Sequence, residues 1–225
     1  MGGIMDTLIT EYIENFLYLD IETLPSGERL TVEEMSEKAP KNYSKPETIN
    51  KWAEKQIEEE YRKRALESER GRLYCIAYAM NDEPIRVISY NEDEKVMMEE
   101  FVTDLKKSYD RTLATCGWVG QNIGEFDIPW LYQRMIKYQI KDIIYYLPDS
   151  PFHKRLIDTG REWTRTQKRG YVSLDTICRF LGIEGKGDVD GSKVYDLFLA
   201  GEHEKTYKYC ASDVDKVRQI WNLIR

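Results

Sequence analysis

The segment from Phe16 to Ile21 is almost continuously apolar and is interrupted only by Asp20, which is typical of a short buried strand. Three later segments have the length and the apolar content of strands, and they span residues 73–80, 85–90 and 112–119. We expect these four strands to form one sheet.

Helical spacing is found between and after these strands. Between residues 92 and 108 apolar side chains recur at helical spacing and charge fills the other face, which predicts an amphipathic helix packed on the sheet. The pattern then indicates a helix over about 126–138, a short strand near 156–158, a helix over 173–181 and helices from 194 onward. Strands followed by alternating helices predict an α/β fold with a central sheet flanked by helices.

Residues 24–70 do not fit this alternation, because they are highly charged and far longer than the roughly 2 to 6 residues of a usual connection. We interpret them as a charged helical insertion, with a helix over about 48–68, in a single domain that spans residues 1–225. The charged face of this helix is either a solvated surface or a guide for a nucleic-acid strand. The basic residues that would form the guide are Lys51, Lys55, Arg62, Lys63 and Arg64.

The composition limits the class of protein and its location. Apolar residues make up 41% of the 225 residues, yet no apolar run approaches the roughly 20 residues of a membrane span. Residues 1–14 lack the features of a secretory signal, so we expect a cytoplasmic protein that contacts no membrane. The net charge of −7 argues against binding nucleic acid by overall attraction. It leaves room for a local basic groove and for carboxylates that hold divalent cations.

The cysteines are scattered and form no C-x-x-C pair, and the chain has two histidines, His153 and His203. A structural zinc site is therefore not expected. Because each cysteine lies in or beside an apolar run, we expect buried thiols in a reducing compartment. The cysteines are Cys75, Cys116, Cys178 and Cys210.

Two carboxylates, Asp20 and Glu22, stand two residues apart at the end of the first strand. The period of a strand places both on the same face, where they repel each other unless a cation lies between them. Ligand sites tend to form at strand ends in open α/β sheets. Strand ends also often carry acids without a metal, so the pair alone predicts a metal site only weakly.

A second group of polar residues precedes the helix over 126–138. Asp127 lies at the expected helix start, and Pro129 occupies the first turn, where its missing N–H costs nothing. Asp127 is either a simple helix cap or a metal ligand near the helix N-terminus. Asn122, in the preceding loop, is expected to hydrogen-bond a substrate or to hold the loop.

The C-terminal helix carries a third pair, Tyr209 and Asp213, which are four residues apart and so project from one helical face. Such a pair can hold a metal and a water together. The alternative is a core tyrosine beside a surface aspartate. Two weaker candidates are Asp158, for which a turn or cap is the stronger interpretation, and Lys186, which could contact a phosphate from the Gly-rich loop over 185–191.

Taken together, the motifs D-x-E, N-x-x-x-F-D-x-P and Y-x-x-x-D resemble those of the DEDD superfamily of 3′-to-5′ exonucleases, in its tyrosine form. The resemblance extends over residues 173–194, which look like the standalone exonucleases related to the proofreading domains of family B polymerases. Residues 39–47 of the insertion are similar to a segment of bacterial and phage members. Gln121 departs from the pattern, since related motifs often have histidine there.

This resemblance implies an RNase H-like α/β fold and a metal-dependent 3′-to-5′ exonuclease. It assigns Asp20, Glu22, Asp127 and Asp213 as ligands of two Mg²⁺ or Mn²⁺ ions, with Asp20 as the bridging ligand. It gives Tyr209 the role of positioning or deprotonating the attacking water. The histidine form of the superfamily would need histidine in place of Lys208.

The resemblance also predicts the substrate and the cellular setting. The substrate is single-stranded nucleic acid, with DNA favoured over RNA, and the candidate protein partners act in replication or repair. The setting is the cytoplasm of a bacterial or phage-infected cell. The rival functions are a catalytically silent nucleic-acid-binding module and an endonuclease or resolvase. The residues predicted to contact the substrate are Thr23, Asn122, Phe126 and Lys186.

Overall fold

The structure, a computed structural model, describes residues 13–90, 92–167, 170–185 and 190–225. The strands are β1 (Phe16–Pro25), β2 (Gly71–Met80), β3 (Arg86–Ile88), β4 (Gly117–Gly120) and β5 (Leu156–Asp158). The α-helices are α1 (Val32–Ser36), α2 (Pro46–Lys63), α3 (Glu94–Leu113), α4 (Asp127–Tyr138), α5 (Thr159–Thr164), α6 (Leu174–Leu181), α7 (Val194–Leu199) and α8 (His203–Ile224). The 3-10 helices are η1 (Arg64–Leu66), η2 (Ile144–Tyr146) and η3 (Gly191–Lys193).

The strands form one mixed sheet in the order β3-β2-β1-β4-β5. The pairs β1–β2 and β2–β3 are antiparallel, whereas β1–β4 and β4–β5 are parallel. The β1–β4 pairing covers Phe16 to Tyr18 and ends two residues before Asp20. The later part of β1 therefore lies beside the loop that follows β4. A central strand that loses a neighbour in this way opens the kind of crevice in which α/β sheets bind ligands.

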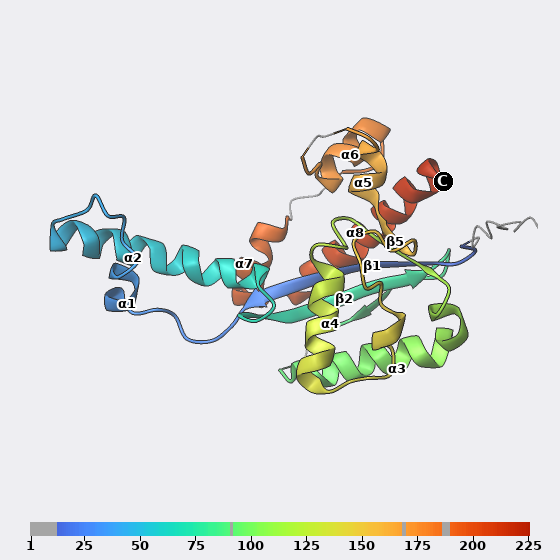
Figure 1. Cartoon of the computed structure of the whole chain (residues 1–225), viewed down its shortest axis with the longest axis horizontal. Helices are drawn as coiled ribbons and strands as arrows, with labels where there is room; N and C mark the ends of the chain where they lie inside the picture. Colours follow the sequence, from blue (N-terminus) through green and yellow to red (C-terminus); the bar gives the residue numbers. More distant parts are fainter. Residues whose placement is uncertain (1–12, 91, 168–169, 186–189) are drawn as a thin grey trace, which may run out of the picture.

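Helices cover both faces of this sheet (Figure 1). One core contains Leu17, Leu19 and Ile21 of β1 packed against apolar residues of α3 and α4. The other contains Phe16 and Tyr18 packed against α6 and α8. Alternate residues of β1 thus enter different cores, as the two-residue period of a strand requires. The predicted α/β fold, with a mixed central sheet flanked by helices, is confirmed.

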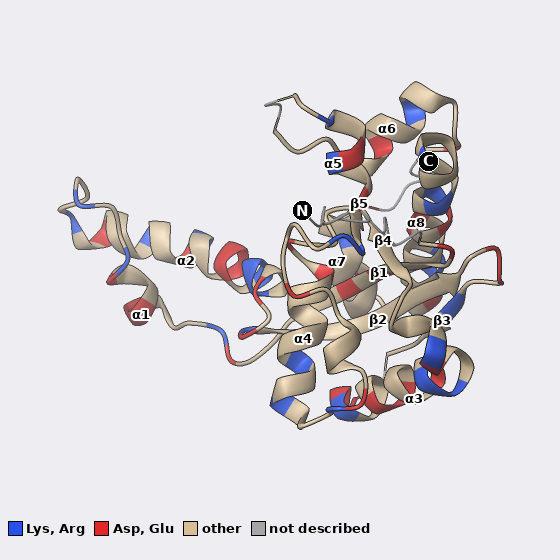
Figure 2. Cartoon of the chain, turned by 45° about the vertical axis from the view of Figure 1, so that its right-hand side comes forward, with Lys and Arg blue, Asp and Glu red and all other residues tan. Residues whose placement is uncertain are grey.

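The connection from β1 to β2 projects away from the sheet (Figure 1). We call residues 26–70 the arm. It contains α1 and α2, which pack on each other, and η1, which leads back to β2. Helix α1 begins with a capping box, in which Thr31 accepts from the backbone N–H of Glu34 and the Glu34 carboxylate accepts from that of Thr31. Both signs of charge occur along α2, whereas the charged residues of α1 are acidic (Figure 2).

Most predicted elements match the structure, but the boundaries of two of them differ clearly. The strand predicted over 112–119 begins only at Gly117, because Thr112 and Leu113 form the last turn of α3. Buried Tyr109 and Leu113 extend the apolar face of that helix, so packing overrides the strand-like local sequence. The predicted helix over 48–68 instead runs from Pro46 to Lys63 and continues as η1. No helix within the described ranges combines the length and apolar character that a bilayer crossing requires.

Candidate active site

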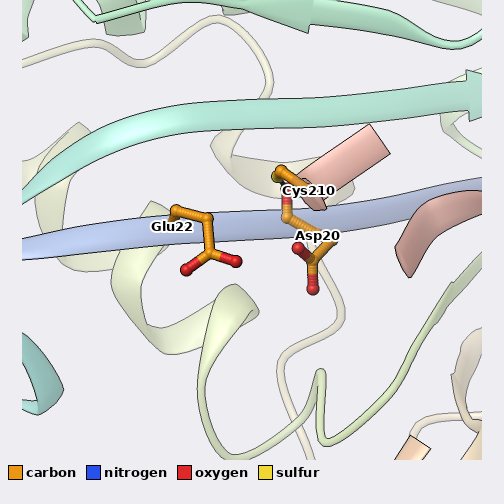
Figure 3. Close-up of side chains that lie close together, drawn as sticks. All are labelled: Asp20, Glu22 and Cys210. Carbon is orange, nitrogen blue, oxygen red and sulfur yellow. Dashed lines mark hydrogen bonds between the residues drawn. The ribbon is translucent and has the colours of Figure 1, made fainter. Parts of the chain in front are cut away.

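Asp20 and Glu22 lie on the later part of β1 and point to the same side of the strand (Figure 3). They belong to the face of β1 that begins with Phe16 and Tyr18 and packs toward α8. Opposite Glu22 and Thr23 the register with β2 shifts, which marks a β-bulge. Bulges are common beside active sites because they change the direction of neighbouring side chains. The acidic pair therefore lies where an otherwise apolar strand face turns polar.

Asp127 is the first residue of α4, and only 3% of it is exposed. Its side chain reaches back to β1, where Oδ1 accepts the backbone N–H of Ile21 at 3.0 Å. The Asp127 carboxylate therefore accepts a hydrogen bond from β1 at a point beyond Tyr18, where the pairing with β4 ends. The N-cap position of α4 is occupied by Phe126. The simple cap interpretation of Asp127 is therefore wrong. Asn122 precedes this turn in the left-handed region at φ 58°, a conformation that asparagine tolerates better than most residues.

Helix α8 supplies Tyr209 and Asp213, one turn apart. Tyr209 is half-buried and packs beside apolar residues near Leu24, whereas Asp213 is 6% exposed. The Asp213 Oδ1 atom accepts a charged hydrogen bond at 3.0 Å from the ammonium of Lys216, which is 5% exposed. The alternative of a surface aspartate is therefore wrong, because Asp213 is buried in an ion pair.

These side chains line one cavity of about 260 Å³. The cavity is formed by β1, the end of η1, the loop before α4, the start of α6 and the middle of α8. Lys186 lies outside the described residues. The predicted site residues that line the cavity are Asp20, Glu22, Thr23, Asn122, Phe126, Asp127, Tyr209 and Asp213.

The carboxyl groups of this site are poorly solvated, and that changes their acidity. Burial, together with the nearby charges of Asp127 and Asp213, raises the pKa of Asp20 well above its ordinary value. Burial also raises the pKa of Asp127 to about 8, although backbone N–H donors oppose the shift. For Tyr209, burial and then the charges of Asp213 and Glu22 raise the pKa. Without a cation, the site therefore resists holding several negative charges.

The available donor atoms fit a hard divalent cation. The Oδ2 atom of Asp20 is buried and has no hydrogen-bond partner among the described residues. One carboxylate oxygen each from Asp20 and Glu22, together with the Cys210 sulfur, lie within 4.8 Å of one another. The Cys210 thiol, however, is engaged as a donor to the Asp20 carbonyl oxygen at 3.4 Å, and burial raises its pKa. The remaining donors are oxygens, which suit Mg²⁺ or Mn²⁺.

Several neighbouring residues have structural roles. Thr23 donates its hydroxyl to the Ala65 carbonyl oxygen at 2.5 Å. Gln121, the departure from the related motif, donates to the Val172 carbonyl oxygen and accepts from the Thr159 hydroxyl, each at 2.7 Å. It therefore joins the loop before α4 to the chain around α5 and α6.

Asp158 caps α5 by accepting the backbone N–H groups of Gly160 at 2.9 Å and Arg161 at 3.3 Å. The cap interpretation of Asp158 is confirmed. The four cysteines are free and buried, as predicted.

Three of the five basic residues proposed as a strand guide are engaged within the protein. Arg62 pairs with Glu58 at 2.8 Å and with Asp196 at 2.6 Å. Lys63 pairs with Glu59. Arg64 is buried and donates to the carbonyl oxygens of Ser26 and Glu28. Arg62 and Arg64 therefore connect the arm to α7 and to residues 26–28, whereas the Lys63 pair lies within α2. Within the described ranges no ion pair involves Lys51 or Lys55.

Four residues beside the site were not identified from the sequence. Lys216 could have been found from its position three residues after Asp213 on the same helical face. Cys210 and Tyr171 have no local pattern that indicates the site. Leu66 reaches the cavity only because the arm returns to β1.

A mixed sheet in the order β3-β2-β1-β4-β5, with acidic residues from β1, α4 and α8 in one cavity, defines an RNase H-like α/β fold. The same fold is found in the family B DNA polymerase from the hyperthermophilic archaeon Pyrobaculum calidifontis. The TM-score is 0.58 at 17% identity, over 93% of this chain and 24% of the polymerase. This chain thus spans about a quarter of the polymerase's length.

Residues 67–221 match the family of predicted 3′-5′ exonucleases related to the exonuclease domain of PolB. Because the match covers more than half of the chain, the protein belongs to this family, and the predicted resemblance to exonucleases related to family B polymerase proofreading domains is confirmed. The matched region includes Asp127, Tyr209 and Asp213, whereas β1 and most of the arm precede it. No curated protein matches the chain.

Proposed function

We propose that this protein removes nucleotides one at a time from the 3′ end of single-stranded nucleic acid, using two bound Mg²⁺ or Mn²⁺ ions. The observation that carries the proposal is the convergence of Asp20, Glu22, Asp127, Asp213 and Tyr209 on one cavity. Membership in a family related to a polymerase exonuclease domain favours hydrolysis from the 3′ end and DNA over RNA.

The ligand roles follow from the position of each carboxylate. Asp20 lies between its acidic neighbours, and its buried Oδ2 atom has no described partner, so we assign it as the ligand shared by both ions. Glu22 of the same strand and Asp213 of α8 would complete the set, and Asp127 would contribute the oxygen that does not bond Ile21. When bound, the ions would lower the pKa of an attacking water and stabilise the leaving oxygen.

Tyr209 is the remaining polar group suited to act on the water. It lines the cavity one helical turn before Asp213. Because the pKa of its hydroxyl is raised, the group is protonated at neutral pH and can donate a hydrogen bond. We propose that Tyr209 either orients the attacking water or accepts its proton once the ions are bound. Thr23, Asn122 and Phe126 line the same cavity and would contact the terminal nucleotide.

Two rival functions make different predictions. A silent nucleic-acid-binding module needs no set of buried carboxylates, which destabilise a protein that holds no cation. An endonuclease or resolvase would cut within a strand. We also propose cytoplasmic action beside replication or repair proteins, in a bacterial or phage-infected cell.

The test is a time course with single strands of DNA and RNA that carry a label on either the 5′ or the 3′ end. With Mg²⁺ or Mn²⁺, the 5′ label should move through a ladder of strands shortened one nucleotide at a time. The 3′ label should appear at once as a mononucleotide. A chelator of all divalent ions should stop both reactions, whereas a zinc-selective chelator should not, because the ligands are oxygens.

The Asp213→Asn variant controls for a contaminating nuclease, since it removes one negative charge and should be inactive. Internal fragments at early times would support the endonuclease, and binding without any cleavage would support the silent module. Activity that is lost on zinc removal and restored by zinc alone would overturn the metal assignment.

A further inference from the structure

Leu66 is an apolar side chain that lies exposed in the wall of the catalytic cavity. It is 68% exposed and is the last residue of η1, where the arm returns toward β2. Leu19 and Leu24 of β1, by contrast, are each 1% exposed. Leu66 lines the same cavity as the carboxylates of Asp20 and Glu22. Single exposed apolar residues are common on protein surfaces, so it is the position of Leu66 in the wall of this cavity, and not its exposure alone, that points to a ligand.

Hydrogen bonds hold Leu66 in this position. The preceding carbonyl oxygen, that of Ala65, accepts the Thr23 hydroxyl at 2.5 Å, and Thr23 directly follows Glu22. The guanidinium of Arg64 is buried and donates to the Glu28 carbonyl oxygen at 2.6 Å. The end of the arm is therefore fixed to the strand that carries the acidic pair.

A second set of contacts connects the arm to the chain before α8. Arg62 pairs with Asp196 of α7 at 2.6 Å, and its guanidinium lies over the Tyr195 ring at 5.0 Å from the centroid. Tyr61 packs against the same ring, with 5.9 Å between centroids. The end of the arm that carries Leu66 is thus attached both to the strand that carries Asp20 and to the segment that leads to α8.

A nucleotide at a strand end has two chemically different parts. Its phosphodiester must lie at the carboxylates, whereas its base presents apolar faces that gain by leaving water. Phe126, which packs against Trp130 at a centroid distance of 5.8 Å, is another apolar residue that lines the cavity. Contact with the face of a base is tolerant of sequence, because every base has such a face.

We propose that Leu66 packs against the base of the 3′-terminal nucleotide, so that the arm forms part of the substrate site. This inference rests on the proposed function, which supplies the strand end. It makes Leu66 a positioning residue: it touches the base and acts on no reacting atom.

The test measures binding rather than cleavage, by fluorescence anisotropy of a 5′-labelled single strand with Mg²⁺ in an Asp213→Asn background. Two strands are compared, one ending in an ordinary 3′ nucleotide and one whose last nucleotide lacks its base. Leu66→Ala should weaken binding of the first strand about 5- to 30-fold, the effect of losing one buried apolar contact. It should change binding of the second strand less than twofold. Leu66→Phe should keep the preference for a terminal base.

Leu223→Ala is the matched control, because Leu223 is 63% exposed on α8 and lies outside the cavity lining. It should bind both strands as the background protein does. Equal weakening of both strands by Leu66→Ala, or no weakening, would overturn the role of Leu66 even if wild-type protein degrades strands. Base-dependent binding through Leu66 in a wild-type protein that cleaves nothing would instead overturn the catalytic proposal alone.

Discussion

The two faces of β1 carry different kinds of side chain where the strand passes the candidate site. The face toward α3 and α4 carries Leu17, Leu19 and Ile21 and is apolar as far as Ile21. The face toward α8 starts with Phe16 and Tyr18 but continues with two acids. One strand therefore anchors a core on one side and presents a charged site on the other.

The difference lies in what each face gains on folding. Leu17 and Leu19 are at most 1% exposed, and burying such a side chain stabilises the fold by about 1.5 to 3 kcal/mol. Asp20 has a buried oxygen without a described partner and acidic neighbours, an arrangement that destabilises the metal-free protein. On the α8 face, Phe16 and Tyr18 gain stability from packing, whereas under the proposed function the part that carries Asp20 and Glu22 would gain it from a bound cation.

Asp20 and Leu19 are adjacent in sequence but lie on opposite faces of β1, so substituting each of them should affect activity and stability very differently. Asp20→Ala should lower the hydrolysis rate on the order of 10⁴-fold or more, because the proposed shared ligand is lost. Its stability without metal should be unchanged or higher, since charge repulsion is relieved. The measurements are single-turnover cleavage and urea unfolding in chelator.

Leu19→Ala is the counterpart on the apolar face and should lower the unfolding free energy by about 2 to 5 kcal/mol. Folded Leu19→Ala protein should keep most of its activity. The distinction between the faces would fail if Asp20→Ala cleaved at the wild-type rate. It would also fail if Asp20→Ala lost as much stability as Leu19→Ala.

Tyr209→Phe tests whether the helix facing the acidic side of β1 takes part in the chemistry. Removal of the hydroxyl should lower kcat by roughly 10- to 10⁴-fold with little change in KM, since the ring still packs against its neighbours. The measurement is single-turnover hydrolysis of a short 3′-labelled strand at saturating Mg²⁺. A rate within about twofold of wild type would leave Tyr209 with a packing role only.

The sequence predicted those parts of the site that local periodicity determines. The two-residue period placed Asp20 and Glu22 on one face of a strand, and the helical period placed Tyr209 and Asp213 on one face of a helix. The strand over Leu156–Asp158 was also predicted with its correct limits. In each case, neighbours in sequence are neighbours in space.

The parts that the sequence did not predict depend on contacts between distant residues. The bond from Asp127 to Ile21 spans 106 positions, and that from Thr23 to Ala65 spans 42. No local pattern specifies either bond, because each depends on how β4 and the arm return to β1. The cavity wall at Leu66 and the thiol of Cys210 behind Asp20 belong to this group.

The dependence of stability on pH tests the claim that the acidic face destabilises the metal-free protein. Burial raises the pKa of Asp127 from 3.8 to about 8, so between these values the folded state binds a proton that the unfolded state releases. The contribution of Asp127 is therefore fully present below about pH 4 and is lost as pH rises toward 8. Asp127→Asn, which keeps an oxygen for the Ile21 N–H, should abolish this loss.

The measurement is the melting temperature of both proteins in chelator from pH 4 to 9. As pH rises, the melting temperature of Asp127→Asn should increase relative to that of the wild type. Each 1 kcal/mol of difference in unfolding free energy should appear as about 2–4 °C for a chain of this size. Carboxylates with lowered pKa, such as Glu60, titrate in both proteins. Their effects on stability therefore cancel when the melting temperatures of the two proteins are subtracted. Saturating Mg²⁺ should reduce the difference in melting temperature between the two proteins at pH 8, because the ion binds the charged wild-type site better than the Asp127→Asn site. Parallel curves in chelator would mean that Asp127 ionises equally in both states, and the contrast between the two faces would then rest on Asp20 and Glu22 alone.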